Sequence, residues 1–312
     1  MRPDASILVL TTSTGLGYGL LAWLGADAAL GLLPAGRTLA AAGIAIALAF
    51  ASIGLMASAF HLGRKERAWR AFSQWRSSWL SREGVAALAT YPVAIAFGLV
   101  VFRSGDDLPA RVLGVAALAA SLGTVYCTAM IYASLKPIRQ WHNAHTAPDY
   151  LLYAIFSGAL LLALLRTLVL GAPGLMASAA AATATLLALI AKVAYWRHID
   201  SQTPLATLTD AIGLPKGATA RALDAPHFTE NFVLREMGFA IARRHAAKLR
   251  RLVLALAIAL PLLLTVLAGL SIAPLAMSSL ALLCAALGLL IERWLFFAEA
   301  THVSAIYYGR AI

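Results

Sequence analysis

Apolar residues follow one another along this chain in long continuous runs, and polar residues gather in the links between the runs. Eight runs are present, each long enough to cross a bilayer, which takes about 20 residues of helix. Strands of a membrane barrel would instead alternate apolar and polar positions. The pattern therefore predicts an all-α fold, a polytopic integral membrane helical bundle with eight transmembrane helices.

The runs set the predicted organisation of the chain. Residues 1–312 are expected to form one membrane domain with two longer polar loops, 61–83 and 197–248. In the first run, Gly15 and Gly19 have the spacing of a GxxxG pair, which predicts a close helix–helix contact. The predicted spans are 6–30, 38–60, 84–102, 110–135, 149–170, 175–196, 252–270 and 274–300.

Composition agrees with a membrane protein. The chain is 61% hydrophobic and 12% charged, whereas a soluble domain averages about 45–50% apolar and about 25% charged residues. Its two cysteines, Cys127 and Cys284, each lie inside an apolar run, and no CxxC occurs. The sequence thus excludes a cysteine-ligated iron–sulfur cluster held by this chain alone, and also a disulfide framework.

Positive charge is distributed unevenly along the chain, whose net charge is +11. The links after the second, fourth and sixth runs, together with the termini, hold 19 lysines and arginines, whereas the opposite links hold 3. Positive loops stay in the cytoplasm, so both termini and both long loops are predicted to be cytoplasmic. Docking of an acidic partner is a second explanation for the same charge, while nucleic-acid binding is disfavoured.

The loop 61–83 combines basic and aromatic residues. Within it, 65–74 is predicted to form an amphipathic helix at the membrane interface, as is 228–245 in the later loop. The aromatic side chains Trp69, Phe72 and Trp79 would then face lipid or a partner. Partner docking is predicted for the basic residues Arg64, Lys65, Arg70 and Arg76 here and for Arg243 and Arg244 in the later loop.

His61 and Glu83 are the best candidates for chemistry at the membrane. They end one predicted span and begin the next, so they are expected at similar depth on the same side. A histidine titrates near neutrality and, with a carboxylate, can hydrogen-bond a quinone and exchange its protons. Alternatively, each residue only complements the dipole of its helix end. Residue chemistry alone leaves both interpretations open.

Other ionisable residues favour structural roles. His142 and His145 lie in a polar loop with too few ligands for a metal site. No haem is expected, because no two histidines fall at mid-depth on facing spans. Glu292, Arg293 and Arg166 are expected to form buried pairs that hold helices together, with a proton path as the alternative. The sequence contains no nucleophile motif, P-loop or HExxH.

Several stretches resemble the membrane anchor subunit family of dimethyl sulfoxide reductase, and the resemblance extends over the whole chain. It begins with His61-Leu62-Gly63 followed by Arg67-Ala68. The longer matching stretches are SWLSREG at 78–84, LKPIRQWHN at 135–143, FTENFVLREMGFAIARRH at 228–245 and ERWLFFAEA at 292–300.

The resemblance implies an inner-membrane, quinone-binding electron-transfer subunit of an oxidoreductase complex. Its partners would be an iron–sulfur subunit and a molybdopterin catalytic subunit, and its own cofactor ubiquinone or menaquinone. His61 and Glu83 fall at positions of the family's quinone site, with Gly63 and Arg67 near it. Related anchors serve either a dimethyl sulfoxide reductase or a cytoplasmic sulfite dehydrogenase, and the sulfite-oxidising branch is favoured here.

Two alternatives to this hypothesis are kept. The first is a secondary anion transporter, for which the helix-interrupting Pro92 and Pro261 are weak support. The second is a passive anchor without a redox role, in which His61 and Glu83 would be dispensable.

Overall fold

The structure is a computed structural model that describes residues 3–33, 37–60, 65–105, 107–203, 206–215, 218–220 and 241–308. Within these ranges eight helices are long and apolar enough to cross a membrane, which confirms the predicted fold class. They are α1 (Ala5–Ala29), α2 (Arg37–Phe60), α3 (Trp79–Ser104), α4 (Leu108–Ala133), α5 (Thr146–Leu170), α6 (Leu175–Ser201), the continuous helix formed by α9 (Ile241–Val253), the π-helical turn η2 (Leu254–Ala259) and α10 (Leu260–Gly269), and α11 (Pro274–Ala298).

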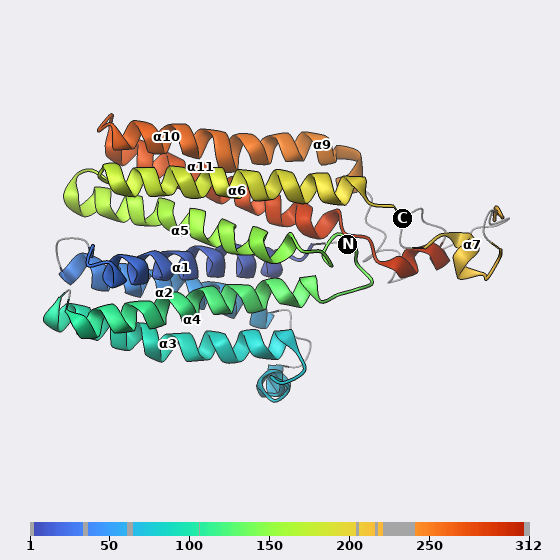
Figure 1. Cartoon of the computed structure of the whole chain (residues 1–312), viewed down its shortest axis with the longest axis horizontal. Helices are drawn as coiled ribbons and strands as arrows, with labels where there is room; N and C mark the ends of the chain where they lie inside the picture. Colours follow the sequence, from blue (N-terminus) through green and yellow to red (C-terminus); the bar gives the residue numbers. More distant parts are fainter. Residues whose placement is uncertain are drawn as a thin grey trace.

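Figure 1 shows these helices side by side in two groups, with α1 to α4 in one and α5, α6, α9–α10 and α11 in the other. Helix α1 joins the groups, because it packs against α2 and α4 on one side and α5 on the other. The start of α1, the end of α11 and the short helix α7 (Leu208–Ala211) all lie at one end of the bundle, which we call the loop end.

The junction between the two groups is built on glycine. A Cβ atom added to Gly19 of α1 would lie 1.9 Å from the carbonyl oxygen of Ala154 in α5. A Cβ atom on Gly158 would lie 2.1 Å from the carbonyl carbon of Gly19. The predicted contact is therefore correct for Gly19 but wrong for Gly15, which has no atom of a neighbouring helix within 4 Å of its Cβ position.

The segment before α3 is helical as predicted, although its start relative to the membrane span differs. Residues Lys65–Phe72 form the 3-10 helix η1 within the predicted helix at 65–74. Helix α3 begins at Trp79, ahead of the predicted span start at residue 84, because Ser78 has an extended backbone and the chain is helical from the next residue on. The hydropathy of a sequence indicates which residues cross the hydrocarbon core, whereas a helix can begin earlier, in the polar interface. Glu83 therefore lies within helix α3 rather than before it.

A packed cap closes the second helix group at the loop end. Trp141, in the link after α4, stacks on Phe296 of α11 with ring centroids 5.7 Å apart, and its indole nitrogen donates to the Phe296 carbonyl at 2.9 Å. Gln140 donates to the Thr301 hydroxyl at 2.6 Å, and Ile138 pairs with His302 as an isolated bridge. The cap thus joins the 135–143 and 292–300 stretches, and the 3-10 helix η3 (Val303–Tyr308) follows it.

Candidate functional site

Glu83 is a buried carboxylate at the loop end of α3. Only 7% of the residue is exposed, and it faces α4, where the Thr128 hydroxyl donates a hydrogen bond of 2.6 Å to its Oε1. Burying a carboxylate without partners is strongly unfavourable, so a polar residue on the facing helix is required. Thr128 Oγ1 also lies 3.2 Å from the carbonyl oxygen of Thr124 and therefore has a second acceptor.

Hydroxyl-bearing residues of α1 and α4 lie near this carboxylate. Tyr18 of α1 and Tyr132 of α4 lie within electrostatic range of it. Tyr18 is 2% exposed, and its hydroxyl has no hydrogen-bond partner among the described residues. Farther along α3 and α4, the hydroxyl groups of Thr90 and Thr124 share a hydrogen bond of 3.1 Å. Glu83 thus occupies a buried polar environment with hydroxyl groups that can donate or accept protons.

The loop 61–83, which we call the basic loop, folds in its described part against the same turn of α3. The Phe72 ring covers Gly84, whose added Cβ would lie 3.1 Å from the ring. The backbone nitrogen of Gln74 donates to the Ser81 hydroxyl at 3.2 Å. Arg82 donates to the Trp75 carbonyl at 2.9 Å and stacks over the Trp79 ring at 4.2 Å. The loop residues after η1 are therefore held directly beside Glu83.

A second polar centre lies in the other helix group, at the same end of the bundle. It consists of four buried charges from three helices, which we call the quartet: Asp149 of α5, Lys192 of α6, and Glu292 and Arg293 of α11. Lys192 donates to Asp149 at 2.9 Å and also pairs with Glu292. Arg293 pairs with Glu292 and donates to Asp149 at 3.2 Å. The formal charges cancel, as buried ions require.

Comparison with known proteins identifies the family of the chain. Residues 11–299 match the family described as DMSO reductase anchor subunit (DmsC). The chain is also 33% identical to one subunit of the sulfite dehydrogenase of Allochromatium vinosum, over 99% of both proteins. This chain belongs to the DMSO reductase anchor subunit family. It is a membrane anchor subunit of a DMSO reductase-type oxidoreductase complex. No solved structure matches it.

The predicted site residues of this anchor subunit are only partly described. His61, Gly63 and Arg64 lie outside the described residues, as do the side chains of Lys65, Arg243 and Arg244. The expected closeness of His61 to Glu83 therefore stays a prediction. Arg67, Arg70 and Arg76 are described and exposed, on or just after η1. Trp69 and Trp75 beside them are 65% and 52% exposed, so this loop presents both charge and aromatic surface.

Buried pairs were expected in the anchor subunit for Glu292, Arg293 and Arg166. The structure confirms a buried pair for Glu292 and Arg293, whereas Arg166 forms its pair while half-buried. The expectation lacked the partners Asp149, Lys192 and, for Arg166, Asp27, whose carboxylate is 2.7 Å away. A signal was present in the sequence. Consecutive spans run antiparallel, so a charge near the start of one span and charges near the ends of later spans meet at the same end of the bundle.

A short chain of polar contacts runs from Glu299, near the quartet, to the surface. Arg250 of α9 donates to Glu299 at 3.0 Å and to Asp200 at 2.6 Å. The Asp200 side chain is 57% exposed, whereas that of Glu299 is 8% exposed. Burial raises the pKa of the Glu299 carboxyl above its ordinary value, and Arg250 partly opposes this rise. Glu299 also lies within electrostatic range of Lys192.

Two of the pockets between the helix groups of the anchor subunit adjoin each other. One is a cavity of about 20 Å³ whose lining includes Thr128, Tyr150, Tyr153 and Arg293. The other is mostly apolar, has a volume of about 260 Å³, and is lined by α1, α2, α5 and α11. The two share residues of their lining, among them Thr12, Ser157 and Leu289. A small cavity lined by several hydroxyl-bearing residues therefore adjoins an apolar pocket within the bundle.

Among the described residues, no group of three or more His, Cys, Asp or Glu side chains is placed to hold a metal ion. Two histidines do meet, since the rings of His145 and His198 lie 4.8 Å apart. They sit at the N-cap of α5 and in the last turn of α6, so the contact is at the loop end and not at the middle of the bundle.

Proposed function

We propose that this anchor subunit transfers electrons between a partner iron–sulfur subunit and membrane quinone, at a site that includes Glu83 and His61 with Gly63 and Arg67 close by. The observation that carries the proposal is the burial of Glu83 beneath an exposed basic loop. An ionisable group at membrane depth is costly and marks a functional site by default. Here the group lies directly behind the surface that a partner would contact.

The surroundings of Glu83 suit quinone chemistry. Reduction of a quinone takes two electrons and two protons, and its two carbonyl oxygens need hydrogen-bond donors. Glu83 in its protonated form, His61 and the neighbouring hydroxyl groups supply donors and proton carriers of this kind. The apolar pocket of about 260 Å³ supports the binding of an amphiphile with an apolar tail. Ubiquinone and menaquinone both fit these requirements.

The loop end would be the docking surface and would face the cytoplasm. Arg70 and Arg76 are exposed there, and the orientation follows from the excess of positive charge in the loops of that end. Arg64, Lys65, Arg243 and Arg244 belong to the same proposed surface. Long-range attraction would bring an acidic iron–sulfur subunit to it, and the molybdopterin catalytic subunit would attach through that partner. The membrane would be the inner, cytoplasmic membrane of the cell.

The substrate of the whole complex is proposed to be sulfite. The support is the relative from Allochromatium vinosum, whose name is that of a sulfite dehydrogenase subunit and which aligns over 99% of both chains. Sulfite and water would give sulfate, two electrons and two protons in the catalytic subunit. The electrons would then reach quinone through the anchor. The alternative is a dimethyl sulfoxide reductase, in which electrons run from quinol to dimethyl sulfoxide.

A membrane assay of the intact, cofactor-loaded complex tests the function. Sulfite is supplied and quinone reduction is followed, and then dimethyl sulfoxide is supplied with a quinol analogue. We expect sulfite-driven quinone reduction. Oxidation of quinol by dimethyl sulfoxide would assign the chain to the reductase branch instead. If the complex oxidises sulfite with a soluble dye but never with quinone, the proposed role of the anchor is wrong.

A further inference from the structure

We propose that a buried, water-assisted proton path runs through the second helix group and joins Glu83 to the surface at Asp200. It consists of the small cavity lined by hydroxyl groups, the quartet, and Glu299 with Arg250. The proposal rests on the proposed quinone site, because it names the route by which that site exchanges protons with water. Each section of the path has its own observation.

The inner section is the hydrogen bond between Thr128 and Glu83. Thr128 Oγ1 lies 2.6 Å from Glu83 Oε1 and 3.2 Å from the Thr124 carbonyl oxygen. When Glu83 is ionised, the Thr128 hydroxyl donates to it. When Glu83 is protonated, the carboxyl donates to Thr128, whose own hydrogen turns to Thr124. Thr128 also lines the small cavity, so it connects Glu83 to that space in either protonation state.

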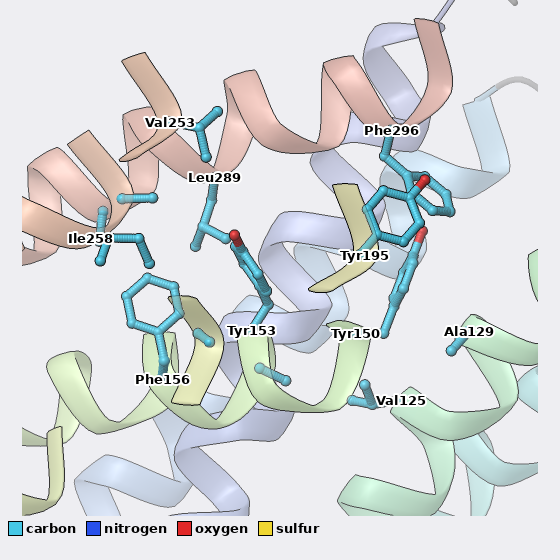
Figure 2. Packing of buried hydrophobic residues seen from close by; sticks show 14 of the residues in the cluster. Val125, Ala129, Tyr150, Tyr153, Phe156, Tyr195, Val253, Ile258, Leu289 and Phe296 are labelled. Atoms are coloured by element: carbon cyan, nitrogen blue, oxygen red, sulfur yellow. The ribbon is translucent and has the colours of Figure 1, made fainter. Parts of the chain in front are cut away.

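The cavity is large enough to hold a water molecule. Its volume of about 20 Å³ exceeds the roughly 10–15 Å³ that one water molecule needs. Tyr150 and Tyr153 line it and are 5% and 4% exposed. The Tyr153 hydroxyl has no hydrogen-bond partner among the described residues, and the Tyr150 hydroxyl has none besides the neighbouring Arg293. Figure 2 shows both side chains rising from α5 toward Leu289 and Phe296 of α11. Buried hydroxyls normally find partners, and a water in this cavity would supply them.

The middle section is the quartet, which the cavity reaches through Arg293. A quartet that only locked the helices together would use all its buried acceptors. Instead, Asp149 Oδ1 is buried and has no partner among the described residues, although Asp149 Oδ2 accepts from both Lys192 and Arg293. A free carboxylate oxygen is an acceptor for a proton or for a water that brings one.

The outer section continues from the quartet to solvent. Tyr195 borders the quartet, because Lys192 Nζ lies 4.3 Å from the centroid of its ring, while its hydroxyl donates to the Gln140 carbonyl at 3.0 Å. Lys192 in turn lies within electrostatic range of Glu299. Glu299 Oε2 is again buried without a partner in the described part of the chain. Its Oε1 accepts from Arg250, which is held to the exposed Asp200 by two hydrogen bonds, of 2.6 and 3.0 Å.

The path accounts for the proton balance of the site. Each quinone reduced there takes two electrons from the partner iron–sulfur subunit and two protons from the cytoplasm. The electrons come from the side where the partner docks. The protons would pass from carboxylates and water along the path to Glu83, and in quinol oxidation they would leave the same way.

Replacing Tyr150 and Tyr153 by phenylalanine tests the path, because each change removes only the hydroxyl oxygen that faces the cavity and keeps the aromatic ring. The assembled complex is assayed with the electron donor and either quinone or a soluble dye, in water and in heavy water. Removing one hydrogen bond from a bridging water should slow the quinone-linked rate about two- to tenfold per hydroxyl. The solvent isotope effect should rise, while the dye-linked rate stays unchanged. Tyr126→Phe, at an exposed position of α4, is the matched control.

Two results would overturn the path. One is an unchanged quinone rate and isotope effect in the Tyr150→Phe, Tyr153→Phe complex. The other, used if that variant assembles poorly, is an unchanged result in Glu299→Gln, which keeps the size of the side chain but cannot carry the proton. A wild-type complex that reduces dye but not quinone would instead refute the proposed function itself, so the two failures are distinguishable.

Discussion

At the scale of single residues, the site depends on one carboxylate and on the hydroxyl groups around it. Glu83 is buried, accepts a hydrogen bond from Thr128, and lies one residue before the glycine on which the Phe72 ring of the basic loop packs. Its burial is tolerable only because polar groups of neighbouring helices face it. The proposed partner in quinone binding is His61, whose role can be tested independently of its position.

We predict that His61→Ala leaves the complex in the membrane and leaves substrate turnover with a soluble dye intact, but uncouples it from quinone. Loss of a positioned proton donor should lower the quinone-linked rate by roughly 100-fold. Parallel dye-linked and quinone-linked assays on the same membranes measure the effect. His142→Ala, at an exposed histidine of the loop end, is the control. Loss of assembly in His61→Ala alone would show that the residue is structural.

Some of these buried polar residues can be identified from the sequence, and others cannot. Glu83 and Arg293 stand out because a charge inside or beside an apolar run is rare and costly. Thr128 does not stand out, because a threonine in a membrane helix is ordinary and only the facing carboxylate makes it important. Asp149 and Lys192 lie near span ends, where charge is common. The alternating direction of the spans indicates that they lie at the same end of the bundle, but their burial and pairing are seen only in the packing of α5, α6 and α11.

At the scale of elements, the number of helices was predictable and their contacts were less so. Every span must be apolar because lipid surrounds it, so the hydropathy of the sequence indicates each span. Helix ends and the 3-10 geometry of η1 depend on local hydrogen bonds, such as that from Gln74 to Ser81, which composition does not reveal. The GxxxG spacing identified the helix that makes the close contact, but only Gly19 of that pair faces α5.

We predict that Gly19→Ala destabilises the packing of α1 against α5. The added methyl group would overlap the Ala154 carbonyl, and overpacking of this kind costs about 1–3 kcal/mol. Thermal unfolding of the purified anchor in detergent measures the change. Gly123→Ala makes the same substitution within α4, where nothing lies within 4 Å of the new atom, and should not lower the unfolding temperature. Equal unfolding temperatures for the two variants would contradict the contact.

At the scale of the whole molecule, charge and chemistry share one end of the bundle. Glu83, the quartet and the exposed arginines of the basic loop all lie near helix ends that meet at the loop end. The uneven distribution of lysine and arginine predicted the orientation, but it could not separate membrane topology from partner docking, since both favour positive loops. A direct test must therefore alter the charge without altering the topology.

We predict that the double substitution Arg70→Glu, Arg76→Glu weakens attachment of the partner subunits, because both side chains are exposed on the proposed docking surface. More of the partners should appear in the soluble fraction, and the loss should increase with salt concentration because surface charges are screened. Arg103→Glu, at an exposed position at the opposite end of the bundle, is the control. Equal retention of partners in both variants would exclude these arginines from the docking surface.

The most direct test of the proposed quinone site is the ratio of quinone-linked to dye-linked turnover in a complex carrying Glu83→Gln. Glutamine keeps the size of the side chain and can still accept the Thr128 hydrogen bond, but it cannot exchange a proton. We predict a normal dye-linked rate and a quinone-linked rate lowered by roughly 100-fold, as expected for the loss of a general acid–base group. An unchanged ratio in a fully assembled complex would contradict the assignment of Glu83 to the quinone site.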